Sequence, residues 1–277
     1  MQRTFDTAGP ATLDLRVPTG EIQIDATLEG RVEVELIAHD EESRALVDAA
    51  RLEQQGDRIL VDVPFRRSGF SFQLLFGRTG ITCRVKCPPS SSVEVRSKSA
   101  DVRAHGVLGA AVVTTASGDV DLETVERDLF VKNASGDVRA ERVGGDVNAN
   151  TASGEVALGY VGGTSTIQGV SGDVRIREAA GDATVKTVSG DQQHDGVFSG
   201  SVYAQSVSGD VVVAVRRGAK VYLDCNTLSG DTSSDLDMTG EPAGDASLIE
   251  IRVKTVSGDI RITRAAAPAD NAQEVHA

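Results

Sequence analysis

The chain has 277 residues, of which 40% are hydrophobic, only 4% are aromatic and 29 are glycine, and its formal net charge is −13. A chain this acidic lacks the basic surface that nucleic-acid binding requires, so we expect no nucleic-acid partner. No stretch approaches 18 apolar residues and the first residues lack the apolar core of a signal peptide, so we predict a cytoplasmic protein without a membrane span.

Residues 1–95 are interpreted as a β-rich N-terminal segment with one helix. Alternating apolar residues predict strands between residues 10 and 37, and acidic residues followed by an apolar side predict a helix at about residues 40–55. Further strands are predicted at 58–63, 81–85 and 93–95. We expect this segment to cap one end of the repeat region described below, because an uncovered terminal strand invites edge pairing.

A phenylalanine-rich stretch at residues 65–78 contains four of the seven phenylalanines of the chain, flanked by arginines. Two interpretations stay open: the rings fold over the end of the repeat region, or they form a contact surface for a protein partner or for peripheral contact with a membrane. The candidate interaction residues are Phe70, Phe72, Leu74, Leu75 and Phe76.

Three cysteines occur, at positions 83, 87 and 225. On one strand Cys83 and Cys87 would lie about 13 Å apart, too far for a disulfide. Their spacing also does not fit a zinc site. Reduced thiols in a cytosolic protein are the simplest interpretation.

An eighteen-residue repeat, marked by Ser-Gly-Asp or Ser-Gly-Glu, occupies residues 96–264. The serines are Ser117, Ser135, Ser153, Ser171, Ser189, Ser208, Ser229 and Ser257, with a degenerate copy at Ser99. A short fixed period predicts stacked units that share one continuous core. The structural turn residues are Gly118, Asp119, Gly136, Asp137, Gly172, Asp173, Gly190, Asp191, Gly209 and Asp210.

Each repeat divides into two similar halves of nine residues, each with a short strand and a turn. Aliphatic residues recur one and four positions before the serine, and three, five and eight positions after it; we expect all these columns to face inward. The fold class is therefore all-β: a parallel, single-stranded β-solenoid (β-helix) of about nine coils. Residues 265–277 have the composition of a disordered tail.

Two polar columns accompany the repeat. The acidic residue of each turn would lie about 4.8 Å from its copy in the next coil, so the repulsion must be offset, either by turn N–H groups or by calcium; we favour the N–H groups. Threonine or asparagine two positions before the serine indicates a hydroxyl or amide ladder, or alternatively an ice- or glycan-facing threonine array.

The sequence predicts no enzyme, no cofactor and no catalytic residues. The one break in the inward pattern is the coil with Gln192, Gln193 and His194, which we interpret as a polar defect in preference to a site, because no nucleophile and acid accompany the histidine.

The repeated Val-Ser-Gly-Asp-Val pattern resembles a bacterial β-strand-repeat family often labelled "putative adhesin", which is related to the toast-rack β-helix domains. The resemblance covers roughly residues 11–264. It implies a β-helix, and a link to cell-envelope stress or surface attachment, without any established catalytic residues.

We therefore expect a non-enzymatic scaffold or protein-interaction module that binds a protein partner or itself. A self-assembling filament of the bactofilin type is the first alternative. A carbohydrate-binding or carbohydrate-active β-helix is the second, and it would require a groove.

Overall fold

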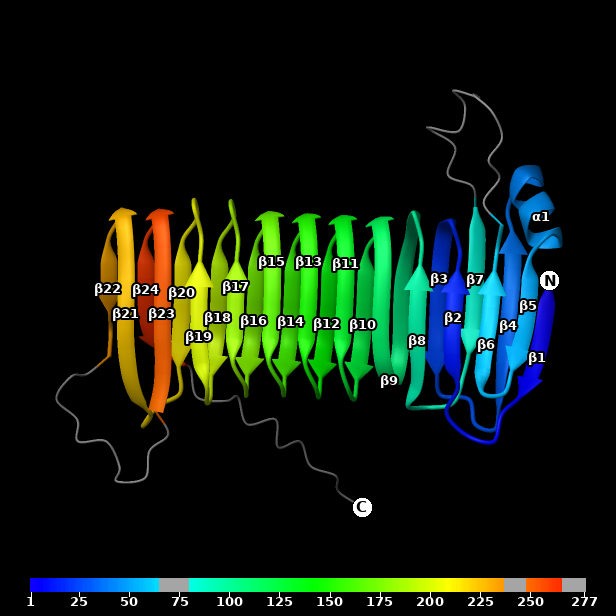
Figure 1. Ribbon diagram of the computed structural model, residues 1–277, viewed down its shortest axis with the longest axis horizontal. Helices are drawn as coiled ribbons and strands as arrows, with labels where there is room; N and C mark the ends of the chain where they lie inside the picture. The colour runs from blue at the N-terminus through cyan, green and yellow to red at the C-terminus, as the bar shows by residue number, and fades with distance from the viewer. Residues whose placement is uncertain (65–79, 237–247, 266–277) are drawn as a thin grey trace, which may run out of the picture.

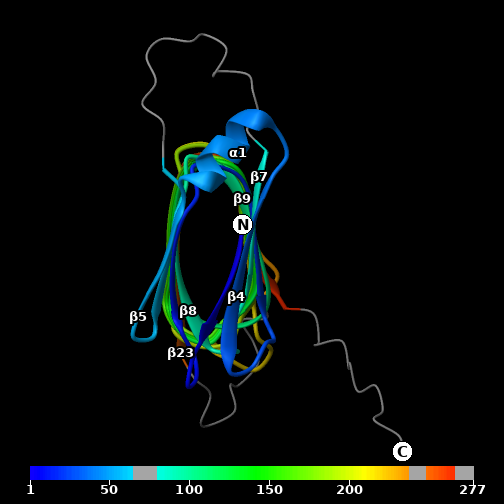
Figure 2. The same cartoon turned by 90° about the vertical axis from the view of Figure 1, so that its right-hand side faces the viewer.

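The computed structural model describes residues 1–64, 80–236 and 248–265. The chain winds into an elongated rack of short strands (Figure 1). Seen along its length, the rack is a flattened oval made of two facing walls (Figure 2). We call these walls sheet 1 and sheet 2, and both run the whole length of the rack.

Sheet 1 contains the strands that follow the Ser-Gly-Asp turns, and sheet 2 contains those that precede them. In spatial order, sheet 1 is β1 (Gln2–Asp6), β4 (Arg31–Ala38), β7 (Ile81–Lys86), β3 (Thr19–Ala26), the first part of β9 (Ser99–Ser117), β10 (Val120–Val125), β12 (Val138–Val143), β14 (Val156–Val161), β16 (Val174–Ala179), β18 (Gln192–Val197), β20 (Val211–Val215), β24 (Ile260–Arg264) and β22 (Thr232–Ser234). Sheet 2 is β5 (Arg51–Gln55), β6 (Arg58–Asp62), β2 (Thr12–Arg16), β8 (Ser91–Arg96), the second part of β9, β11 (Leu129–Ser135), β13 (Val147–Ser153), β15 (Ser165–Ser171), β17 (Ala183–Lys186), β19 (Ser201–Gln205), β23 (Leu248–Ser257) and β21 (Lys220–Ser229).

The predicted parallel stacking is confirmed. Val120 pairs with Val138, Val138 with Val156, and Val156 with Val174, all in parallel strands. The four side chains are at most 2% exposed and form one internal file. Identical β-branched residues therefore meet their own copies, which suits their restricted rotamers and fills the narrow core.

One of the expected inward columns is wrong. The residues directly before the turn serines lie outside, where Val170, Val188 and Val207 keep about half of their surface exposed. The physical reason is the strict alternation of a strand: the inward positions of sheet 2 are six, four and two before the serine, so the position one before it faces solvent.

The turns depend on glycine for two reasons, as Gly172 illustrates. Its φ is +124°, in the region that residues with a Cβ rarely adopt. A Cβ there would also press on the carbonyl oxygen of Gly154 in the neighbouring coil. The chain can therefore change direction and stack closely only where this side chain is absent.

The N-terminal segment joins the sheets directly. Thr19-Gly20-Glu21 pairs with residues 99–101, so it forms a turn of the same stack, and β6 and β7 add a further coil beyond β2 and β3. At this end three pairs of strands are antiparallel: β1 with β4, β4 with β7, and β5 with β6. The helix α1 (Glu41–Asp48), capped by Asp40, lies beside β4 at the N-terminal end of the rack (Figure 1).

The predicted helix over residues 40–55 is too long. The helix ends at Asp48, and residues 51–55 form β5, which pairs antiparallel with β6. The reversal at Gly56, whose φ is +62°, closes this hairpin, and Leu52 is buried in the core instead of on a helix face. Tertiary pairing has overridden the helical pattern here.

The C-terminal coils do not stack in sequence order. β23 inserts between β19 and β21, and β24 between β20 and β22. The turn at Ser257 therefore stacks on Ser208, and the turn at Ser229 is the outermost. The last coil of the sequence is thus the second from the end of the rack.

Two predictions concern residues that the structure does not describe. The candidate interaction residues from Phe70 to Phe76 and the tail beyond residue 265 both lie outside the described residues.

Candidate functional site

The outward face of sheet 2 carries a strip without acidic residues. In each of seven coils, it consists of the side chains that lie five, three and one positions before the turn serine. These residues belong to β9, β11, β13, β15, β17, β19 and β23, or follow directly after β17 and β19. In a chain with 41 acidic residues, this acid-free strip holds four basic ones and otherwise amides, hydroxyls and apolar groups. Its members are Val112, Phe130, Asn148, Thr166, Thr184, Tyr203 and Arg252; Thr114, Lys132, Asn150, Gln168, Lys186, Gln205 and Lys254; and Ala116, Ala134, Ala152, Val170, Val188, Val207 and Val256.

A groove of about 510 Å³ lies within the strip. One wall is the polar column from Lys132 to Gln205, and the other is the aliphatic column from Ala152 to Val207. The floor comes from the column two before the serine, where Thr151 and Thr187 flank Gly169. The groove deepens at Gly169, because every other repeat from Ser117 to Ser257 has a hydroxyl or amide side chain at this position.

The threonine column is buried and bonds to the turns. The hydroxyls of Thr115 and Thr151 each donate to the carbonyl of the turn serine two residues later, at 3.0 and 3.1 Å. Two others bond to a neighbouring coil: the hydroxyl of Thr187 lies 3.2 Å from that of Ser206, and the hydroxyl of Thr227 donates to the carbonyl of Gly258 at 3.0 Å. These hydroxyls therefore hold the turns, and their methyl groups line the groove floor.

The acidic column forms a ladder with backbone N–H groups. The Asp119 carboxylate accepts from the N–H of Asp137 at 2.9 Å, and Asp137 accepts in turn from Glu155 at 2.9 Å. This hydrogen bond is the main reason why the pKa of Asp137 lies below its ordinary value. The N–H groups therefore offset the repulsion, and the described residues contain no cluster of three metal-ligating side chains.

A second groove, of about 620 Å³, lies on sheet 1 and does contain acids. His105 and Glu123 meet there, with 2.5 Å between Nδ1 and Oε2, although the two side chains are 75% and 41% exposed. Glu123 also accepts the N–H of Gly106. This contact joins β9 to β10 at the surface, where a polar contact between exposed side chains contributes little.

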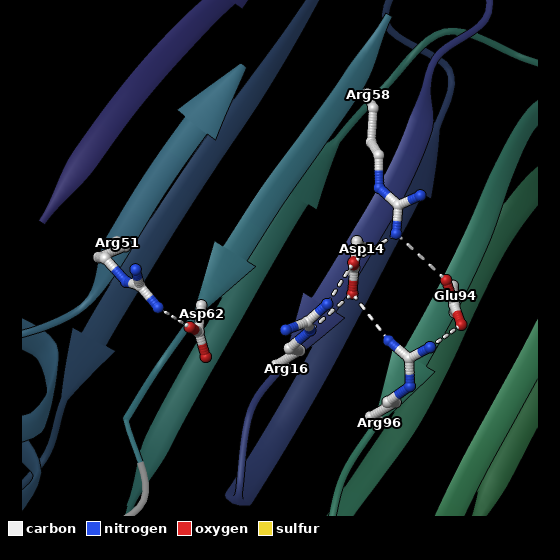
Figure 3. A network of polar contacts seen from close by, with 7 residues as sticks. All are labelled: Asp14, Arg16, Arg51, Arg58, Asp62, Glu94 and Arg96. Carbon is white, nitrogen blue, oxygen red and sulfur yellow. Dashed lines mark hydrogen bonds and ion pairs between the residues drawn. The ribbon is translucent and has the colours of Figure 1, made fainter. Parts of the chain in front are cut away.

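At the N-terminal end of sheet 2, seven charged side chains form ion pairs (Figure 3). The Asp14 side chain is 1% exposed. Its carboxylate accepts two hydrogen bonds from Arg16, one from Arg58 at 2.6 Å and one from Arg96 at 3.3 Å. Burial raises its pKa, but the hydrogen bonds and charges of Arg16 and Arg58 outweigh this and hold the pKa below its ordinary value. This cluster ties three neighbouring strands together and marks where the acid-free strip begins.

The polar break in the repeat lies inside the core. His194 is 1% exposed, stacks between Ile176 and Val213, and has no hydrogen-bond partner on either ring nitrogen. Burial lowers its pKa to about 4. Gln192 beside it donates to Thr187. The histidine is therefore neutral and enclosed, as a polar defect in the core would be.

The cysteines give no information on the compartment. Cys83 and Cys87 are unpaired and fully buried, and burial raises their pKa values to about 12 and about 11. Such thiols are unreactive in oxidising and reducing surroundings alike. The cytoplasmic location stays a prediction.

The sequence did not reveal the acid-free strip. The structure places the predicted turn glycines and aspartates between the two sheets, but they hold the fold. The repeat did contain the signal. In seven coils, the positions five and three before the serine lack acidic residues. The position one before the serine is aliphatic, although the alternation of side chains along the strand places it outside.

Comparison with known proteins agrees with this architecture. The Toastrack DUF4097 family model matches residues 11–263. A "putative adhesin" from Bacteroides fragilis is 12% identical, with 95% of this chain and 96% of that chain covered and a TM-score of 0.41. One from Parabacteroides distasonis is 10% identical, with 94% and 96% covered and a TM-score of 0.43.

A second Parabacteroides distasonis protein, titled "Putative lipid binding protein", is 10% identical, with 95% of this chain and 96% of that chain covered and a TM-score of 0.31. These likenesses are too distant to assign a function, and no curated protein matches the chain. No helix in the described ranges is long and apolar enough to cross a membrane. From its repeat, its two parallel sheets and the match over residues 11–263, the chain belongs to the Toastrack DUF4097 family.

Proposed function

We propose that the protein is a non-enzymatic interaction module that contacts its partner through the acid-free strip. The observation that carries the proposal is the segregation of charge. Acidic residues occupy the turns, sheet 1 and the two ends of sheet 2, whereas the strip has four basic residues, amides and an exposed aliphatic column. An exposed apolar column beside uncharged polar groups is typical of a contact surface.

The chemistry of the grooves supports a non-enzymatic role. The groove in the strip has no carboxylate or histidine along its lining, so it lacks the acid and base that hydrolysis of a glycosidic bond requires. In the groove of sheet 1, the histidine and glutamate are paired with each other at the surface.

The resemblance of the repeat to the adhesin-labelled family implies a role in envelope stress or attachment, and we extend the proposal to binding at the cell envelope. A paired sheet suits this role, because its backbone already holds the strip residues at a fixed spacing and needs no ordering on binding.

Binding of the purified chain to cell-envelope preparations tests the proposal. Lys186→Glu combined with Lys254→Glu places negative charge on the strip and is expected to reduce binding strongly. The matched control is Arg175→Glu combined with Arg261→Glu, which makes the same change on sheet 1. Equal binding by the two double variants would contradict the proposal.

A filament built by head-to-tail stacking has less support from the two ends. At the N-terminal end the outermost strand of sheet 2, β5, runs antiparallel to the coils, whereas at the C-terminal end β21 is parallel to them. Head-to-tail growth in parallel register requires the same strand direction at both ends.

A further inference from the structure

We propose that the groove in the acid-free strip binds an uncharged glycan chain that lies along the axis of the rack. The inference deepens the proposed function and rests on it. It begins from one residue, Gly169, which stands where the other repeats from Ser117 to Ser257 have threonine, asparagine or serine.

Gly169 is not required by the backbone. Its φ lies outside the left-handed region, and it pairs in regular register with Thr151 of β13. A Cβ there would make only ordinary contacts, 3.6 Å to Cγ2 of Thr187 and 3.7 Å to Cγ2 of Thr151. A glycine inside a strand weakens the strand and often marks a place where a ligand approaches closely. The missing side chain opens the groove floor, so we infer that it makes room for a ligand.

The groove has the length and direction of an extended chain. Its polar wall runs through five coils, from Lys132 through Asn150, Gln168 and Lys186 to Gln205. At about 4.8 Å per coil, four steps span about 19 Å. An amide or an amino group recurs at this spacing, so the wall offers a linear polymer one polar contact for each coil.

The side chains of the wall match hydroxyl groups. The amides of Asn150, Gln168 and Gln205 each provide donors and an acceptor, as sugar hydroxyls do. Asn150 is held by a 2.8 Å hydrogen bond to Asn148, and Lys186 stands over the ring of Tyr203, 5.7 Å from its centre. The opposite wall of exposed valines can cover the C–H groups of a sugar ring.

Charge and backbone pairing disfavour the main competitors. The net charge of −13 and the acidic turns on both long sides of the strip disfavour a polyanion. A polypeptide that adds as a strand needs unpaired backbone groups, and here the groove lies on a sheet face whose backbone is already paired between coils. An uncharged polymer of hydroxyl-bearing rings satisfies both conditions.

The experiment is a titration of the full chain with soluble mannan, β-glucan and N-acetylglucosamine oligomers, and with polygalacturonate as the anionic arm. We expect at least one uncharged probe to bind. Gly169→Thr fills the floor with the side chain that neighbouring coils have, and should weaken this binding by about tenfold or more without lowering the melting temperature. The control Ala157→Thr adds the same side chain on sheet 1 and should leave binding unchanged.

The inference is overturned if no uncharged probe binds, if polygalacturonate binds more tightly than all of them, or if Gly169→Thr binds like the wild type. If envelope binding still depends on Lys186 and Lys254 in any of these cases, the proposed function stands without the glycan. If the strip variants bind envelopes normally, the proposed function fails as well.

Discussion

Replacing His194 by isoleucine should stabilise the protein and remove part of its acid sensitivity. The ring lies between Ile176 and Val213 in an otherwise aliphatic file, and both ring nitrogens lack partners. A buried polar group without a hydrogen bond costs about 1–3 kcal/mol. Isoleucine is similar in volume and continues the file, so we expect the free energy of unfolding at pH 7 to rise by about 1–3 kcal/mol.

The pH dependence gives a second, independent magnitude. The pKa of His194 falls from an unfolded value of about 6.5 to about 4 in the fold, because burial disfavours the charged ring. The unfolded state therefore binds more protons than the native state between these two values, so stability is complete above about pH 6.5 and declines as the pH falls towards 4. A difference of about 2.5 pKa units corresponds to about 3 kcal/mol.

Urea unfolding followed by circular dichroism, at pH 7 and at about pH 4.5, measures both effects. The wild type should lose more stability on acidification than His194→Ile, by up to about 3 kcal/mol. The control Ile176→Val alters a neighbour in the same file but keeps the buried histidine, and should leave the wild-type slope intact. A parallel loss of stability in His194→Ile and the wild type, or a less stable variant at pH 7, would refute the reasoning.

Three further predictions concern the turns and the ion-pair cluster. Gly172→Ala should destabilise the protein by at least about 2 kcal/mol, because the new Cβ meets the Gly154 carbonyl at a positive φ; Gly169→Ala is the tolerated control in the same thermal melt. EDTA should leave the melting temperature unchanged, since the turn carboxylates such as Asp119 already accept backbone N–H groups, and a drop in that temperature would revive the calcium ladder. Asp14→Asn should cost about 1–2 kcal/mol at pH 7. Because the pKa of Asp14 is lower in the folded state, its contribution to the free energy of unfolding is present above the unfolded pKa and disappears as the pH falls. The difference in stability between variant and wild type should therefore narrow in acid. A difference in urea unfolding that stays constant with pH would count against the ion-pair explanation.

The regular part of the fold could be predicted because the period is strict. From Ser117 to Ser189 the serines are 18 residues apart, and the observed register follows this spacing strand by strand. The ends could not be predicted. The insertion of β23 between β19 and β21 is a choice among long-range pairings that all share the same repeat pattern, so the repeat does not predict it. Residues 51–55 have a helical pattern, but they form a strand because β6 offers an edge to pair with.

The acid-free strip shows the same limit on a smaller scale. The residues one before the turn serines are aliphatic, and a sequence pattern alone assigns such residues to a core. Only the alternation of the folded strand places Val170, Val188 and Val207 outside and the threonine column inside, with its hydroxyls on the turn carbonyls. The glycine at position 169 gains meaning only once its neighbours are known to line a groove.

The sequence by itself determined the repeating coil: glycine where the chain must turn without a Cβ, aspartate where a neighbouring N–H needs an acceptor, and β-branched residues where like meets like. These are local requirements repeated at a fixed spacing, so composition and period are enough to predict them. The tertiary structure alone decided the order of the terminal coils, the enclosure of His194 and the position of the acid-free strip on the outer face of sheet 2. Each of these depends on contacts between residues far apart in the chain, and such contacts exist only after the coils have stacked.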